Sequence, residues 1–75
     1  MKKSELNAML DVLNEYSTAH GIYRALGDEK AAVVADGVRA IKRVLEAAGV
    51  NSDIINDCSG KAFAKGMKRA KAVQQ

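Results

Sequence analysis

His20 and Cys58 are the most reactive side chains of this 75-residue chain, and each is the only residue of its kind. A cysteine thiolate can act as a nucleophile when a histidine lies beside it and a third group orients that histidine. Nothing in the spacing of these two residues arranges such a meeting. A tetrahedral zinc site needs four ligands, which one cysteine and one histidine cannot supply. We therefore expect no catalytic residue, metal or cofactor here, and predict that Cys58 is a small buried residue.

Two carboxylates, Asp53 and Asp57, are four residues apart and would share one face of a helix. Such a pair can chelate a hard cation or act as acid and base. No glycine-containing calcium loop surrounds them, and a short exposed helix offers no pocket that would shift a pKa. Helix capping and solubility explain them better, so the sequence predicts a protein that is not an enzyme.

Positive charge is concentrated near the end of the chain. Residues 1–37 hold four basic and six acidic side chains, a net charge of −2, whereas residues 38–75 hold eight and three, a net charge of +5. The candidate binding residues are the five cations after Gly60, which no acid accompanies: Lys61, Lys65, Lys68, Arg69 and Lys71.

Such a strip can dock into an acidic groove of a partner protein, follow nucleic-acid phosphates or lie on an anionic membrane. It can also be the solvated face of a bundle helix, since cations are favoured near a helix C-terminus. Among binding partners we expect a protein first and nucleic acid as the alternative. A membrane is the least expected, because Phe63 and Met67 are the only bulky side chains available to insert.

The segment 44–58 looks like a helix-turn-helix motif, with Gly49 at the turn and apolar residues on either side. It departs from that motif at Leu45, where a smaller residue is usual before the turn. Its second helix would present Asp53, Asn56 and Asp57, whose charge has the wrong sign for phosphates. The joint is therefore part of the alternative, nucleic-acid interpretation.

The element that organises these candidates is a helix predicted over residues 28–48. Its apolar residues alternate at spacings of three and four, and they include Val34, Gly37, Val38, Ile41 and Leu45. Asp28 is a good N-cap, and Gly49 followed by Val50 is typical of a Schellman stop. A glycine inside a helix costs about 1 kcal/mol relative to alanine. We therefore expect Gly37 to mark a close crossing with another helix.

Two further main helices are predicted, over residues 4–20 and 61–73. Ser4 is the expected N-cap of the first, which should bend or break near Gly21 before a short turn at 22–26. The alternative is a helix that runs through, with Tyr23 and Leu26 on a shifted face. A separate short helix at 52–58, capped by Asn51 or Ser52, should end at Ser59-Gly60. The helix at 28–48 would lie centrally, with Leu6, Leu13 and Tyr16 of the first helix and Phe63 and Met67 of the last packed on its apolar stripe.

These elements predict one all-α domain over residues 1–75, a small bundle of three main helices. The chain has no proline and few aromatic residues, so its core consists of small side chains and a monomer would be marginally stable. A homodimer would add stability, and Val34, Gly37, Val38, Ile41 and Leu45 are the candidate packing or dimer residues. No apolar stretch is long enough for a membrane span or a signal peptide, so we expect a cytoplasmic location.

The function predicted from the sequence is that of a non-enzymatic interaction protein: an adaptor, regulator or inhibitor that binds a larger macromolecule.

Overall fold

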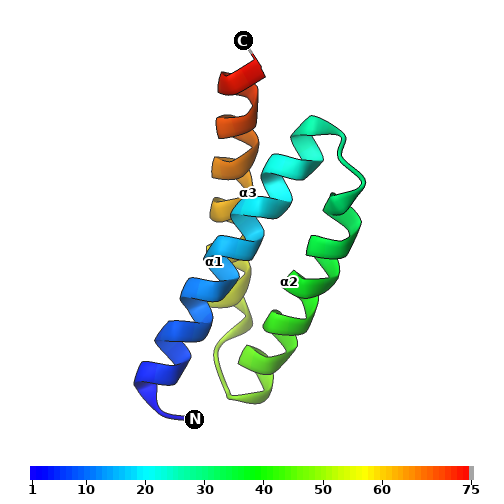
Figure 1. Cartoon of the computed structure of the whole chain (residues 1–75). Helices are drawn as coiled ribbons and strands as arrows, with labels where there is room; N and C mark the ends of the chain where they lie inside the picture. The colour runs from blue at the N-terminus through cyan, green and yellow to red at the C-terminus, as the bar shows by residue number, and fades with distance from the viewer. Residues whose placement is uncertain (75) are drawn as a thin grey trace.

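The computed structural model describes residues 1–74, and in that part the chain forms three helices and no strand. The helices are α1 (Lys3–Leu26), α2 (Lys30–Ala47) and α3 (Ser52–Gln74). They form an elongated bundle of 42 × 19 × 18 Å, with α2 to the side of α1 and α3 behind it (Figure 1). The predicted all-α bundle of three main helices is confirmed.

The predicted break near Gly21 is wrong, because α1 continues through that residue to Leu26. Gly21 is buried where α1 crosses α3, and a Cβ atom there would overlap the carbonyl oxygen of Phe63. Gly66 of α3 is its counterpart, since a Cβ atom there would overlap the carbonyl oxygen of Thr18. The close approach of the two backbones explains both glycines and offsets their low helix propensity.

The predicted interruption at Ser59-Gly60 is also wrong, since the expected short helix and the C-terminal helix are one continuous α3. Ser59 is buried against α1, where its Oγ lies 3.0 Å from the Oγ of Ser17. Gly60 lies on the solvent side of the helix, where a Cβ atom would meet nothing within 4 Å. Burial of the α1-facing side thus outweighs the local cost of the Ser-Gly pair.

Both turns end a helix in the way expected for Gly49. Gly27 (φ 67°) and Gly49 (φ 89°) adopt the left-handed conformation that suits glycine. After each, the backbone N–H of the next residue donates back to the preceding helix, from Asp28 to the Tyr23 carbonyl and from Val50 to the Leu45 carbonyl. These are Schellman hydrogen bonds.

Side chains that precede α2 and α3 accept hydrogen bonds from the first backbone N–H groups of those helices. Asp28 accepts a hydrogen bond from the backbone N–H of Lys30 (2.9 Å), and Asn51 accepts one from that of Asp53 (2.7 Å). The predicted cap Asn51 is therefore confirmed, whereas the N-cap position of α2 is occupied by Glu29 and Asp28 lies one residue before it. Ser4 is not the cap of α1, because the helix starts at Lys3 and Lys2 occupies the N-cap position.

The central helix is α1, which corrects the prediction that the helix at 28–48 lies centrally. α1 packs against both other helices, most extensively against α3, while α2 and α3 touch each other least. Phe63 and Met67 are only half-buried. The buried stripe of α3 begins with Ile55 and continues with small residues, which are Ser59, Ala62, Gly66 and Ala70.

The bundle has two kinds of interior. Near the α2–α3 turn, Leu13, Val38, Leu45 and Ile55 form a core of larger side chains, and partly buried neighbours such as Ile41 cover it. Burying each of the larger aliphatic side chains stabilises the fold by about 1.5–3 kcal/mol. Towards the other end, small residues bring α1 and α3 close together. The molecule is therefore held by ordinary apolar packing at one end and by close helix contact at the other.

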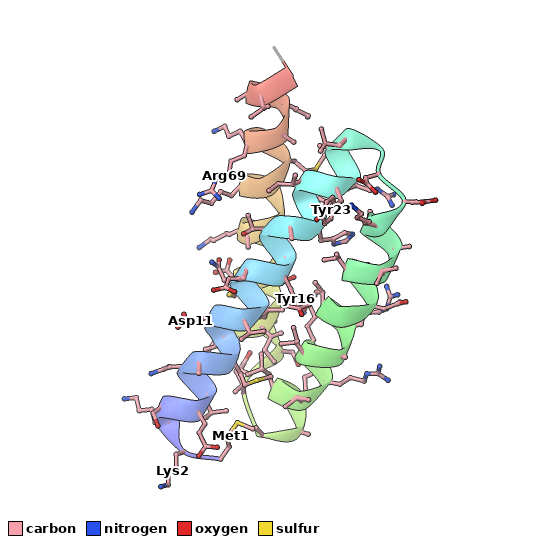
Figure 2. The ribbon with its side chains drawn as sticks, in the orientation of Figure 1. Met1, Lys2, Asp11, Tyr16, Tyr23 and Arg69 are labelled. Atoms are coloured by element: carbon pink, nitrogen blue, oxygen red, sulfur yellow. The ribbon has the colours of Figure 1, made fainter. Side chains whose placement is uncertain are left out.

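Gly37 of α2 faces the side chain of Tyr16, and not the backbone of another helix as predicted. A Cβ atom at this position would lie 3.0 Å from a ring carbon of Tyr16. The Tyr16 side chain lies between α1 and α2 (Figure 2). Gly37 therefore makes room for an aromatic ring, and the close approach of two backbones occurs at Gly21 and Gly66 instead.

Candidate interaction surface

The five predicted binding cations all lie exposed on α3: Lys61, Lys65, Lys68, Arg69 and Lys71. We call this group the basic surface. Most of it faces away from the side of the helix that carries Ala62, Gly66 and Ala70 and is buried against α1, whereas Arg69 lies at the edge of that buried side. Within residues 1–74, the only ion pair of the basic surface joins Lys61 Nζ to Asp57 Oδ2 at 3.0 Å. The other four cations are available to an external anion.

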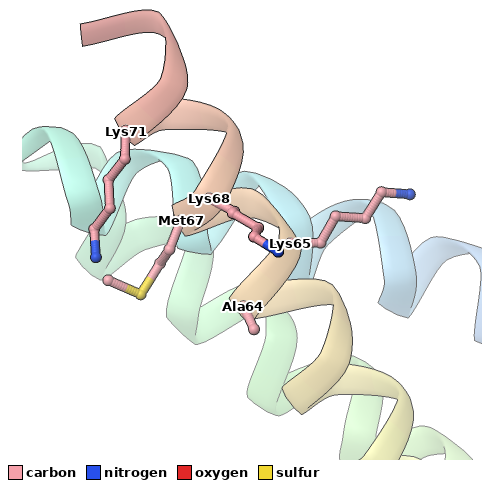
Figure 3. A pocket seen from close by; sticks show the side chains of 5 residues that line it. All are labelled: Ala64, Lys65, Met67, Lys68 and Lys71. Carbon is pink, nitrogen blue, oxygen red and sulfur yellow. The ribbon is translucent and has the colours of Figure 1, made fainter. Parts of the chain in front are cut away.

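An open hollow of about 550 Å³ lies within the basic surface, lined by Ala64, Lys65, Met67, Lys68 and Lys71. Figure 3 shows the side chains of Lys71 and Met67 on the same side of the helix, whereas that of Lys65 points away from them. A half-buried methionine among lysines offers a flexible apolar contact together with positive charge. This combination suits a surface that binds a macromolecule better than one that holds a small substrate.

The outer face of α2 also carries cations, but acidic residues lie among them. Arg39 pairs with Asp36, and Glu46 lies beside Lys42 and Arg43. The Nζ of Lys42 donates a 3.4 Å hydrogen bond to Asn56 of α3. The outer face of α2 therefore lacks the single sign of the basic surface.

The structure reveals an apolar hollow that the sequence reasoning missed. It lies between the C-terminal ends of α1 and α3 and is lined by Ile22, Leu26, Arg69, Ala70 and Val73. Ile22 and Leu26 share a face of α1 that departs from the main apolar stripe of that helix. Because α1 is continuous through Gly21, these two residues form a second apolar face at the end of the helix.

His20 packs its ring edge-on against Phe63 of α3, with 4.8 Å between the ring centroids. Burial lowers the pKa of His20 below its usual value of 6.5, and the nearby cations Arg24, Arg39 and Lys42 lower it further. His20 is therefore held in its neutral form, as a half-buried aromatic side chain among cations.

Cys58 is a half-buried residue next to α1, and its Sγ lies 3.9 Å from the carbonyl oxygen of Leu10. Burial raises the pKa of the Cys58 thiol, and the carboxylates of Asp57 and Asp11 raise it further. A thiol in such surroundings is a poor nucleophile at neutral pH. His20 and Cys58 thus face different neighbours, an aromatic ring and a backbone carbonyl.

The two carboxylates of α3, Asp53 and Asp57, do not act as a pair. Asp57 pairs with Lys61, and Asp53 is exposed in the first turn of the helix. Among residues 1–74, no three His, Cys, Asp or Glu side chains gather closely enough to hold a metal ion. No helix in that range combines the length and apolar character needed to cross a membrane.

The joint at 44–58 consists of the end of α2, a turn and the beginning of α3. Figure 1 shows the two helices running in opposite directions, with little contact between them. Asp53, Asn56 and Asp57 are exposed on the first two turns of α3. An anionic ligand at this joint would therefore meet acidic side chains before it reached the basic surface.

The candidate packing or dimer residues of α2 have different surroundings. Val38 and Leu45 are buried within the chain, and Ile41 partly covers the same core. Val34 is half-buried beside Tyr16 and Tyr23 of α1. Together with Gly37, these residues face the chain's own α1 and core.

The sequence matches no family model, and searches of curated proteins and of solved structures find no similar protein.

Proposed function

We propose that this chain is a non-enzymatic interaction protein, an adaptor, regulator or inhibitor that binds a larger protein through the basic surface of α3. The observation that carries the proposal is that four of its five cations lack an acidic partner within residues 1–74 while the opposite side of the helix is buried. Such a helix can present positive charge without disturbing its own packing. An acidic groove on a partner is the complementary surface.

The surroundings of the reactive side chains also support a binding role. His20 is kept neutral against Phe63, and the Cys58 thiol has a raised pKa. The hollows along the basic surface are open, whereas an enzyme encloses its substrate in a cleft with convergent polar groups. The proposal includes two further parts, a cytoplasmic location and a homodimeric state.

The test is a pull-down from lysate with the wild-type protein and with a charge-reversed variant, Lys61, Lys65, Lys68 and Arg69→Glu. A matched control reverses four exposed cations elsewhere, Lys2, Lys3, Lys30 and Arg43→Glu. Half of each sample is treated with nuclease, and the helix content of each variant is checked by circular dichroism.

We expect the wild type to capture proteins even after nuclease treatment. The control should capture the same proteins, and the charge-reversed variant should not. Once purified, a captured protein should bind the wild type directly. Equal capture by both variants would reject the basic surface as the binding site.

Nucleic-acid binding is the second candidate, favoured by the single sign and length of the basic surface. Residues 61–71 extend over about 15 Å of helix at 1.5 Å per residue, a distance that spans several phosphates. The predicted signature is an affinity that falls steeply with salt, with a shallower slope after the four cations are neutralised. Undetectable binding to mixed-sequence DNA and RNA at low salt would end this interpretation.

A further inference from the structure

The apolar hollow between the ends of α1 and α3 adjoins the basic surface. Ile22 and Leu26 form its α1 side, Ala70 and Val73 form its α3 side, and the volume is about 300 Å³. Arg69 belongs both to this hollow and to the basic surface. The two features are therefore continuous and can contact one ligand together.

The hollow is open because α2, the helix that does not line it, packs elsewhere. After Leu26, Gly27 reverses the chain towards α2, which packs on another side of α1. Leu26 remains 46 % exposed and Val73 84 % exposed. Single exposed apolar residues are ordinary, but two large ones around a concave surface are typical of a docking site.

The charge around the hollow identifies the occupant by its chemistry. Arg69 is exposed at the rim, and Lys65 lies about one turn earlier on the same helix. No acidic residue occurs after Gly60. A ligand that fills the hollow therefore gains from carboxylates beside its apolar group, whereas a basic or purely apolar segment does not.

We propose that the hollow holds a bulky apolar side chain, such as Leu or Phe, from an acidic amphipathic helix of a partner protein. The Asp and Glu residues of that helix contact Arg69 and Lys65. This inference rests on the proposed function and adds to it the anchor residue and the charge of the partner segment. Helical segments of this kind are recognised through apolar anchors at spacings of three or four residues.

The test uses a phage-displayed library of random peptides about four helical turns long, selected against the wild-type protein. We expect the selected peptides to share bulky apolar residues three or four apart with Asp or Glu between them. The hollow variant Leu26→Ser with Val73→Ser removes apolar surface and leaves the charge unchanged. Its control, Ile54→Ser, removes another exposed aliphatic side chain that lies outside the hollow.

We expect the hollow variant and Arg69→Glu each to bind the selected peptides with an affinity lower by about tenfold or more. The control should bind them with unchanged affinity. All of these residues are exposed, so circular dichroism should show intact folds.

If charge reversal of the basic surface weakened the binding of the selected peptides but the hollow variant did not, this inference would be overturned and the proposed function would stand. The absence of any acidic consensus would also overturn it. If, in addition, only nucleic acid bound in a charge-dependent way, the proposed function would fail as well.

Discussion

His20 shows how the charge of one side chain is constrained from all three helices. Phe63 of α3 covers one edge of its ring, Arg24 lies further along α1, and Arg39 and Lys42 approach from α2. A protonated imidazole would lose hydration and be repelled by all three cations. The folded state therefore favours the neutral ring.

This environment predicts a pH dependence of stability. The pKa of His20 is lowered below 6.5 in the folded protein, so the unfolded chain binds the proton at higher pH. The histidine therefore lowers the free energy of unfolding as pH falls below about 6.5 and has no such effect above it. Urea denaturation of wild type and His20→Gln, each at about pH 7.5 and about pH 5.5, measures the difference.

We expect the wild type to lose more stability on acidification than His20→Gln does. The carboxylates titrate in both proteins, so their contribution cancels in the comparison. A wild type that gained stability relative to the variant at the lower pH would show that an acid contacts His20.

At the scale of elements, the contact between α1 and α3 depends on two glycines. An added methyl group at Gly66 would overlap the Thr18 carbonyl and lie 3.1 Å from the Ile22 backbone nitrogen. Because these neighbours are backbone atoms, only separation of the two helices can relieve the clash. The glycines therefore determine how closely the helices pack.

We predict that Gly66→Ala destabilises the protein by about 1–3 kcal/mol, measured by chemical denaturation. Gly60→Ala is the matched control, since it lies on the same helix with nothing within 4 Å of an added Cβ. That change should stabilise the protein by up to about 1 kcal/mol. Equal effects of the two substitutions would mean that helix propensity alone explains both, and that the close crossing is absent.

These glycines also explain which elements the sequence could predict. The helix predicted at 28–48 agrees with α2 to within two residues at each end, because its apolar stripe, Asp28 and Gly49 are all local signals. Gly21 and Ser59-Gly60 look locally like helix ends, and only the contact between α1 and α3 keeps the helices continuous. One signal of that contact was visible: small residues four apart, at Ser17, Gly21 and Ala25, matched by Ala62, Gly66 and Ala70.

One part of the candidate site could be predicted from the sequence and the other could not. The basic surface was predictable, because a run of cations without acids is exposed in almost any helical packing. The apolar hollow was not, because it exists only where the end of α1 lies beside the end of α3. Residues such as Leu26 and Val73 show no local pattern that would relate them.

At the scale of the whole molecule, the proposed homodimer needs an exposed apolar face. Val33, Ala40 and Val44 lie on one side of α2, and Val33 and Val44 are 72 % and 44 % exposed. Their spacings of seven and four residues suit a seam between two α2 helices. Val38 and Leu45 are covered by the chain's own helices and are not available for this contact.

We expect sedimentation equilibrium to give twice the 8.0 kDa mass of one chain. Val33→Asp with Val44→Asp should shift the protein to monomers, because two buried carboxylates would oppose each other across the seam. Ala8→Asp with Ala32→Asp, at exposed positions elsewhere, should leave the mass unchanged. A wild-type protein that remains monomeric at high concentration would contradict the dimer.

The contact between Ser17 and Ser59 joins residues 42 positions apart in the chain, which has a consequence for how the protein folds. Helical bundles fold fast when neighbouring helices supply most of the contacts. Here α1 packs mainly on α3, so the formation of its main interface closes a loop that contains α2 and both turns, at a larger entropy cost than the pairing of adjacent helices. The principal partner of α1 is therefore the more distant of the other two helices in the sequence, and we infer that folding is slower than for a bundle of this size with sequential pairing.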